Sequence, residues 1–264
     1  MNYFDGLLLG ALQGVTEFLP ISSSGHLVLA ESFLGLKVEN LKSFDVFVHL
    51  ATFLVIMIYF WSDVKKLILF EKSYRKLIAY IIIGTLPAVI VGFLWGDLLD
   101  EVFRNARSVA ALMIMVGGIF ILAEIFYKKL AVKKNLEEMN WKHSLVIGLA
   151  QALALVPGIS RSGATIVGGI VQGVKREDAA KFSFLLGLPA MLGAFTLTAF
   201  KMSTADFQAI NIGPSLAGFI AAILFGLISV SLLMKFLKNN SLNVFAVYRI
   251  LLGIGILLYF YNFM

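Results

Sequence analysis

The sequence predicts an all-α protein that crosses a membrane several times and consists of two related halves. Three observations lead to this prediction. Hydrophobic residues make up 59% of the 264-residue chain and charged residues 14%, with a mean hydropathy of +0.90, whereas about a quarter of an average soluble domain is charged. Apolar runs approaching the roughly 20 residues of a spanning helix recur along the chain, and the sequence matches itself at a fixed offset.

Composition also excludes several functional classes of protein. The chain has no cysteine, which excludes thiolate catalysis, Cys-ligated zinc and disulfides. Its net charge of +6 comes from basic residues in short loops between apolar spans, so the charge indicates membrane topology and no nucleic-acid partner. The start of the chain lacks a basic n-region and a small-residue cleavage site, and we read Met1 onward as mature protein. We expect a single membrane domain over residues 1–264.

An internal repeat relates residues 1–127 to residues 139–264 with an offset of 138. Of the first 44 positions, 13 are identical in the two copies. Apolar bias alone does not produce matched polar residues in one register. The polar matches include Gln13/Gln151, Ser22/Ser160, Ser24/Ser162, Lys37/Lys175 and Glu39/Glu177.

Each half is expected to begin with a long apolar region that has a polar break, followed by three unbroken spans. The broken regions lie at about 6–35 and 144–173. The spans lie at about 44–61, 77–96 and 109–127 in the first half, and at about 182–200, 214–234 and 244–263 in the second.

Loop charges favour broken regions that return to the side they entered. If both regions crossed the membrane, 11 Lys and Arg residues would lie on one side and 9 on the other; if both return, the numbers are 15 and 5. The positive-inside rule prefers the second arrangement. Three crossings per half turn the second half upside down, so we expect an inverted-topology repeat with about six full transmembrane helices, two re-entrant helical hairpins that meet near the midplane, and extracytoplasmic termini.

Irregular backbone at membrane depth is tolerated where protein or a water-filled cavity satisfies its polar groups. The two breaks are therefore expected to line one interior site. The alternative is that their Ser and Gly residues only allow close helix packing.

The two breaks share a frame and differ in chemistry. The first supplies Glu17 and His26, and the second supplies Arg161 where the first has Ser23. A charged side chain near the bilayer centre costs about 2.5 to 3.5 kcal/mol, so Glu17 and Arg161 need a function or a partner. A composite site, with a base or metal ligand from one copy and an anion clamp from the other, explains this divergence; a structural Glu17–Arg161 ion pair is the plainer alternative.

Several residues of the breaks suit phosphate chemistry. Gln13 and Glu17, four residues apart, lie on one helix face and can bind the same object. Hydroxyls and free amides that precede a helix bind anions, and Arg161 offers a planar fork of donors. His26 suits proton transfer, and Ser23 could act as a nucleophile if a base activates it, although a lone histidine is more often only hydrogen-bonded. The candidate phosphate-binding residues are Ser22, Ser24, Gly25, Ser160, Ser162 and Gly163.

Other polar residues within the spans are weaker candidates. Glu124 and Arg249 lie near expected cytoplasmic ends, where snorkelling is the ordinary explanation. His49 is either a second histidine of the site or a helix–helix hydrogen-bonding residue. His143 is expected to be solvated.

The stretch Gln-x-x-x-Glu-Phe-Leu-Pro-x-Ser-Ser-Ser-Gly-His at Gln13–His26, with Pro-Gly-x-Ser-Arg-Ser-Gly-Ala-Thr at Pro157–Thr165, resembles the two signatures of the undecaprenyl-diphosphate phosphatase family, also called bacitracin-resistance proteins. The resemblance covers essentially the whole chain. It implies a hydrolase of the inner membrane that removes the terminal phosphate of a polyprenyl diphosphate at the outer face, recycling the carrier lipid of cell-wall synthesis. It further implies inverted repeats with two re-entrant hairpins, a tendency to form homodimers, and a divalent cation, Mg²⁺ or Ca²⁺.

Position by position, the resemblance implies that Glu17 is the essential acidic residue, His26 the family's histidine and Ser23 the nucleophile or a phosphate ligand. Arg161, with Ser160 and Thr165, matches the phosphate-binding signature. This sequence departs from many members at Gln13, where they have a glutamate. A metal held by Gln13 and Glu17 would therefore depend on a single carboxylate.

The expected reaction is in-line attack by Ser23 on the terminal phosphorus with His26 exchanging protons; attack by a water that Glu17 activates is the rival route. A lipid flippase or secondary transporter is the alternative function, because many transporters contain inverted repeats with broken helices. Phosphate release that is lost in Glu17→Ala distinguishes the enzyme from the transporter. A phosphatidic-acid-type phosphatase would need a second histidine shortly after Arg161, and residues 165–171 contain none.

Overall fold

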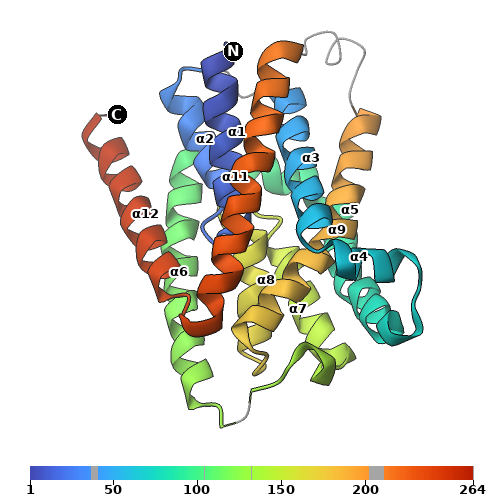
Figure 1. Ribbon diagram of the computed structural model, residues 1–264. Helices are drawn as coiled ribbons and strands as arrows, with labels where there is room; N and C mark the ends of the chain where they lie inside the picture. Colours follow the sequence, from blue (N-terminus) through green and yellow to red (C-terminus); the bar gives the residue numbers. More distant parts are fainter. Residues whose placement is uncertain (37–40, 104, 132, 202–210, 264) are drawn as a thin grey trace.

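The computed structural model describes residues 1–36, 41–103, 105–131, 133–201 and 211–263, which form helices joined by short loops (Figure 1). Lys37 and Glu39, two positions of the repeat match, lie outside the described residues. The first half contains α1 (Tyr3–Phe18), α2 (Ser23–Phe33), α3 (Lys42–Tyr59), α4 (Trp61–Ile68), α5 (Arg75–Phe103) and α6 (Ala106–Lys129). The second contains α7 (Trp141–Leu153), α8 (Arg161–Ile170), α9 (Arg176–Lys201), α11 (Ile212–Asn239) and α12 (Asn243–Phe263).

Five of these helices, α5, α6, α9, α11 and α12, are long and apolar enough to cross a membrane. A sixth crossing results only if α3 and α4 are counted together, and the chain bends by 90° between them. The predicted span at about 44–61 corresponds to α3 within two residues, and the sequence did not predict that the chain turns in another direction at α4.

Two helical hairpins carry the polar breaks. The first hairpin is α1–α2 and the second is α7–α8. In Figure 1 the first lies in the upper half of the molecule and the second in the lower half, and their tips meet near the centre. Both first arms begin with an asparagine N-cap at equivalent positions of the repeat, Asn2 and Asn140, whose side chains accept from amides that a helix start leaves unpaired.

The second arms also begin alike. Ser22 and Ser160, which are 138 residues apart, have φ angles of 75° and 78°, a left-handed conformation that costs a non-glycine residue about 1 to 3 kcal/mol. In each turn the serine Oγ accepts the backbone N–H of the glycine three residues later, Gly25 at 3.3 Å and Gly163 at 3.2 Å. The strained turn places a helix start at the centre of the protein from each side.

Each hairpin packs its first arm against a helix of the other half. Helix α1 runs along α11, and α7 runs along α5. Gly6, Gly10 and Gly14 are spaced by four residues and face the α11 backbone, so that a Cβ on Gly10 would overlap the backbone of Gly218. Glycine at these positions allows the close backbone contact that stabilises helix pairs in membranes.

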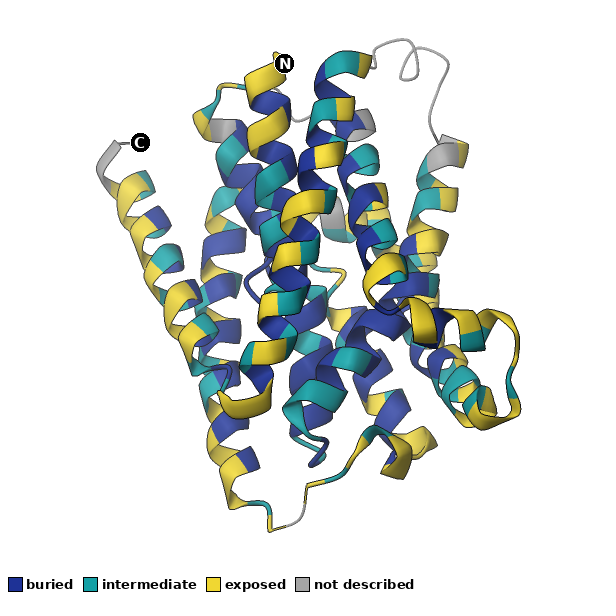
Figure 2. Cartoon of the chain, viewed as in Figure 1, coloured by how far each residue is buried: buried dark blue, intermediate teal, exposed yellow. Residues whose placement is uncertain are grey.

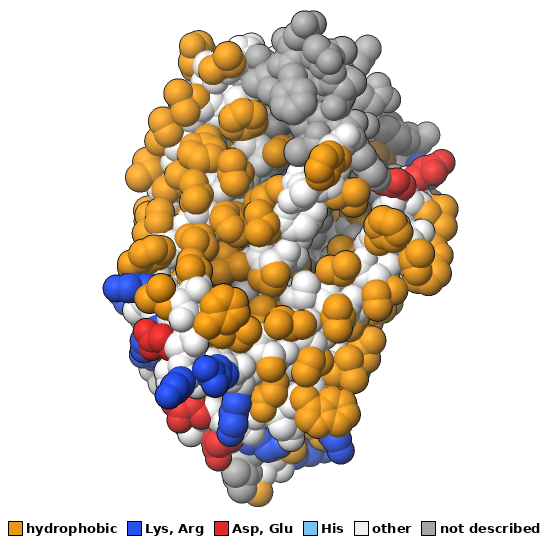
Figure 3. All heavy atoms as spheres, turned by 90° about the vertical axis from the view of Figure 1, so that its right-hand side faces the viewer, with side chains coloured by type: hydrophobic (Ala, Val, Ile, Leu, Met, Phe, Trp, Pro, Cys, Tyr) orange, Lys and Arg blue, Asp and Glu red, His pale blue; other side chains and the backbone are white. Residues whose placement is uncertain are grey.

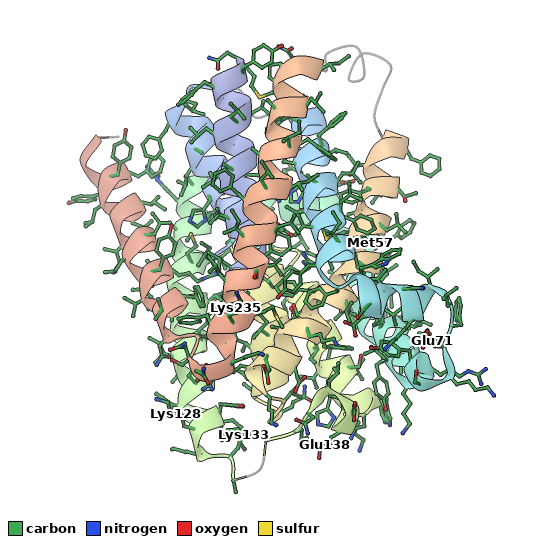
Figure 4. The ribbon with its side chains drawn as sticks, in the orientation of Figure 1. Met57, Glu71, Lys128, Lys133, Glu138 and Lys235 are labelled. Atoms are coloured by element: carbon green, nitrogen blue, oxygen red, sulfur yellow. The ribbon has the colours of Figure 1, made fainter. Side chains whose placement is uncertain are left out.

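The outer surface suits a lipid environment. Exposed residues lie on the outward faces of the helices and buried residues lie between them (Figure 2). Only 17% of the apolar window of α5 and 22% of that of α12 are buried inside the protein. Hydrophobic side chains cover much of the face shown in Figure 3, and most of its Lys and Arg side chains lie towards the lower end. Lys128, Lys133 and Glu138 lie at that end (Figure 4).

Two predictions about isolated charged residues are wrong. Glu124 and Arg249 do not snorkel, because both are fully buried. Glu124 accepts hydrogen bonds from Arg176 Nε at 2.8 Å and from the backbone N–H of Leu242 at 2.9 Å. It thereby joins α6 to the start of α9 and to the loop before α12. The prediction rested on how close the two residues lie to the ends of their helices, and this distance does not show that other helices and loops cover them.

His143 is buried, contrary to the prediction that it is solvated. Its Nδ1 lies 2.7 Å from Asn140 Oδ1 and its Nε2 lies 2.9 Å from Lys134 Nζ. Because the ammonium of Lys134 can only donate, Nε2 accepts and the imidazole is neutral. Burial, with Lys134 nearby, lowers the pKa of His143 below its ordinary value.

Candidate active site

The carboxylate of Glu17 lies at the centre of the site. Glu17 is in the last turn of α1, and Gln13 lies one turn earlier on the same face, as their spacing predicts. Gln13 Nε2 donates to Glu17 Oε2 at 3.1 Å. Both side chains are buried, so this carboxylate depends on the protein for its hydrogen bonds.

Arg161 brings the second hairpin to Glu17. It is the first residue of α8, and its Nη2 lies 2.8 Å from Glu17 Oε1. The ion pair that was the plainer alternative therefore exists. It leaves the other guanidinium nitrogen, Nη1, buried without a hydrogen-bond partner among the described residues. A buried, unpaired donor next to a carboxylate is costly in a purely structural pair and indicates a position for an anion.

Ser23 completes the cluster. It is the first residue of α2, and its Oγ donates to Glu17 Oε2 at 2.6 Å. One carboxylate thus contacts the candidate nucleophile of its own hairpin and the candidate phosphate ligand of the other. This contact is the geometry in which a base activates a hydroxyl.

The side-chain hydrogen bonds described for His26 go to Ser22 and Tyr248. Its Nδ1 lies 2.7 Å from the Ser22 carbonyl oxygen, and its Nε2 lies 2.7 Å from the hydroxyl of Tyr248 in α12, with the two rings stacked. Because a carbonyl only accepts, Nδ1 carries the proton, and in the neutral ring Nε2 accepts from Tyr248. His26 therefore holds the strained Ser22 turn, and the base that Ser23 contacts is Glu17, whereas the sequence led us to expect that His26 exchanges protons.

His49 joins the site from α3. Its Nδ1 lies 2.9 Å from Gln13 Nε2 and 3.9 Å from Glu17 Oε2. Its side chain is 35% exposed, against 8% for Glu17. Of the two interpretations that the sequence left open, membership of the site cluster is the one that these distances favour.

Most of the candidate phosphate-binding hydroxyls form hydrogen bonds within the protein. Ser22 and Ser160 cap their own second arms, and Ser24 Oγ lies 3.4 Å from Ser22 Oγ. Ser162 Oγ reaches the backbone carbonyl of Glu17 in the other hairpin at 3.4 Å. Thr165 donates to the Arg161 carbonyl at 2.7 Å. An anion that enters the site would therefore meet Arg161 and Ser23 first.

Sequence reasoning missed two residues that shape the site and explained a third by snorkelling. Tyr248 has no local signal, because its partner His26 lies 222 positions away. Gly187 of α9 lies against Arg161, and a Cβ there would overlap Nη1. The repeat contained a signal for Gly187, since it occupies the position equivalent to His49. The third residue is Arg249, whose buried guanidinium donates to the carbonyl oxygens of Pro20 at 3.3 Å and Gly158 at 2.7 Å.

A divalent cation would find few protein ligands here. The described residues contain no cluster of three or more His, Asp or Glu side chains suited to a metal. Glu17 is the single carboxylate, and the amide oxygen of Gln13 beside it is buried without a hydrogen-bond partner. Two oxygen ligands fit Mg²⁺ or Ca²⁺ when phosphate oxygens supply others, as is usual for Mg²⁺ in phosphoryl-transfer sites. The residues present thus suit a cation that is shared with the substrate.

The chain matches one family model, and the similar proteins described below share one name. The family model described as Bacitracin resistance protein BacA matches residues 6–255. The chain is 40% identical over 259 residues to an undecaprenyl-diphosphatase of Carboxydothermus hydrogenoformans, covering 97% of each chain. It is 40% identical over 274 residues to that of Geotalea daltonii, covering all of both, and 36% identical over 274 residues to that of Methanosphaera stadtmanae, covering 96% of each.

Proposed function

The chain belongs to the bacitracin resistance protein BacA family, and from this premise we propose that it is a multi-pass membrane enzyme that hydrolyses undecaprenyl diphosphate to the monophosphate and phosphate where its two hairpin tips meet. The observation that carries the proposal is the joint contact of Ser23 and Arg161 with Glu17. The relatives provide the reaction, and this contact supports its location.

Arg161 provides the anion site. A diphosphate group carries more negative charge than one carboxylate, so it attracts the guanidinium away from Glu17 and uses the unpaired Nη1 as well. Planar guanidinium donors match phosphoryl oxygens and stabilise the charge that develops on the transferred group. The exchange leaves the carboxylate of Glu17 free to accept a proton.

The nucleophile is Ser23. Its Oγ–H gives its proton to Glu17, Oγ bonds to the terminal phosphorus, and the bridging P–O bond breaks to leave undecaprenyl phosphate. A water then attacks the phosphoserine phosphorus and passes its proton to the departing phosphate, while Glu17 returns the first proton to Ser23 Oγ. His26 keeps the Ser22 turn and hence Ser23 in position through its bonds to the Ser22 carbonyl and Tyr248. This role differs from the proton exchange with Ser23 that the sequence led us to expect.

A cation would assist at the same place. Glu17 and the amide oxygen of Gln13 would hold Mg²⁺ or Ca²⁺ together with phosphate oxygens, and the ion would neutralise charge on the diphosphate.

The test of the mechanism is a search for the phosphoenzyme. Purified protein is mixed with undecaprenyl diphosphate labelled in its terminal phosphate and quenched in acid within one turnover. We expect labelled Ser23 in the wild type, no label in Ser23→Ala, and slow labelling in Glu17→Gln. An active Ser23→Ala variant with no labelled intermediate in the wild type would overturn the covalent route in favour of direct water attack.

We further propose that the hairpins are re-entrant, that the two halves have inverted topology, and that the site opens to the extracytoplasmic side. The opposite placement of the hairpins in Figure 1 and the 15-to-5 distribution of basic residues support this arrangement. Single cysteines introduced at Ser73 and Asn105 test it in a chain that has no other thiol. In intact cells an impermeant thiol reagent should label position 105 and leave position 73 unlabelled; the reverse pattern would overturn the orientation.

A further inference from the structure

Arg249 of α12 is the largest of the fully buried side chains, although it carries a charged group. The reaction proposed above does not use it. Burying an unpaired guanidinium in a membrane protein is expensive, so its contacts must account for its presence.

Those contacts join the two hairpin tips. Nη1 donates to the carbonyl oxygen of Pro20 and Nη2 donates to that of Gly158. Pro20 and Gly158 are 138 residues apart and are therefore equivalent positions of the repeat. One guanidinium thus supplies a donor to the equivalent carbonyl in each half, and its Cζ lies over the ring of Phe120, 5.3 Å from the centroid.

The two carbonyls need these donors. Pro20 follows the end of α1 and Gly158 lies between α7 and α8, so neither is within a helix, and buried backbone carbonyls without a partner are rare because they cost free energy. A fork with two parallel donors can satisfy both at a fixed separation, which a single ammonium cannot do.

The position along the chain links these contacts to the reaction. Pro20 is three residues after Glu17, and Gly158 is three residues before Arg161. Arg249 therefore fixes each tip close to the residue that the tip contributes to the Glu17–Arg161 pair, without touching that pair according to the hydrogen bonds described.

We propose that Arg249 is a positioning residue that holds the two hairpins in register, so that Ser23 and Glu17 of one face Arg161 of the other. This inference builds on the proposed function. It assigns to α12 a role in catalysis that acts through the backbone of both tips.

Steady-state kinetics with purified Arg249→Met test the proposal. Methionine fills part of the buried volume and donates no hydrogen bond. We expect kcat to fall about 100-fold, the order of loss that a displacement of about 1 Å causes, and KM to change less than about threefold, because Arg249 does not touch substrate. Arg249→Lys, which retains the charge and satisfies one carbonyl at a time, should fold like the wild type and lose roughly tenfold in kcat.

A double-mutant cycle separates positioning from general stability. If Arg249 acts by aligning Arg161, then Arg161→Ala should reduce kcat far less in the Arg249→Met background than in the wild type. The matched control is Glu124→Gln, which also disturbs a fully buried charged group that bonds next to α12. Glu124→Gln should lower the unfolding temperature and leave kcat of the folded fraction unchanged. Arg161→Ala should then reduce kcat by the same factor in the Glu124→Gln background as in the wild type.

The outcomes are distinct. A normal kcat in Arg249→Met and Arg249→Lys, or losses that multiply in the cycle, would overturn the positioning role alone. Wild-type activity in Arg161→Ala would instead overturn the proposed active site. The inference is supported if the effects of Arg249→Met and Arg161→Ala on kcat are non-additive in free energy while those of Glu124→Gln and Arg161→Ala are additive.

Discussion

Gly187 of α9 leaves the space that the guanidinium of Arg161 occupies: a Cβ at Gly187 would overlap Nη1. The equivalent position in the first half is His49, which lies beside Gln13 and Glu17. The same repeat position thus holds a polar side chain, His49, in one half and a glycine without side-chain atoms, Gly187, in the other. Arg161 of the second half fits because Gly187 has no side chain.

Gly187→Ala is therefore expected to displace Arg161 without unfolding the protein. Activity should fall about 10- to 100-fold, because small displacements of a catalytic group cost that much. Phosphate release from undecaprenyl diphosphate measures the loss. Gly193→Ala on the same helix is the matched control, since nothing lies within 4 Å of its Cβ; equal activity in the two variants would contradict the steric argument.

Tyr248→Phe removes the hydroxyl that holds His26 Nε2. We expect a moderate fall in kcat, roughly three- to tenfold as for one neutral hydrogen bond, with a smaller loss than in Arg161→Ala. Tyr261→Phe, at an exposed position on the same helix, should remain fully active. A Tyr248→Phe variant with wild-type kcat would show that His26 is held without this bond.

Gly10→Leu separates α1 from α11, because even a Cβ at Gly10 would overlap the backbone of Gly218. Overpacking of this kind costs typically about 1 to 3 kcal/mol, occasionally more. Thermal unfolding in detergent should show a clearly lower midpoint. Gly118→Leu in α6, where a Cβ would meet open space, should unfold at nearly the wild-type temperature.

Removal of divalent cations with a chelator should abolish phosphate release, and added Mg²⁺ or Ca²⁺ should restore it. Gln13→Glu adds a second carboxylate beside Glu17 and should lower the Mg²⁺ concentration needed for half-maximal activity. A titration of activity against free Mg²⁺ compares the two proteins. Activity that persists in chelator would argue against a required cation.

Stability should fall as the pH is lowered through the range below about 6.5, because the pKa of His143 is lower in the folded protein than its ordinary value. In that range the unfolded chain binds a proton that the folded chain does not, and acid therefore favours unfolding. The unfolding midpoint at pH 5.5 should lie further below that at pH 7.5 in the wild type than in His143→Gln. An equal pH dependence in both would exclude His143 as the cause.

The sequence predicted the parts of the site that depend on spacing and register. The interval of four residues placed Gln13 beside Glu17, and the difference between the two copies singled out Glu17 and Arg161, which are in contact. It did not predict the bend between α3 and α4, because residues 44–61 contain no Gly or Pro to indicate one. The partner of His26 depends on how α12 packs, and no local pattern records such a contact. The tendency to dimerise stays a prediction.

The exchanged packing of α1 on α11 and of α7 on α5 has a consequence for ancestry. Neither half can cover its own first arm, so a protein with a single copy of the repeat would expose the Gly6–Gly10–Gly14 face to lipid. Such a protein would need a second copy to cover that face and to bring a second tip to the first. The fused chain makes permanent a pairing that two separate copies would otherwise have to find by diffusion, and it allows the two copies to carry different residues of the candidate site.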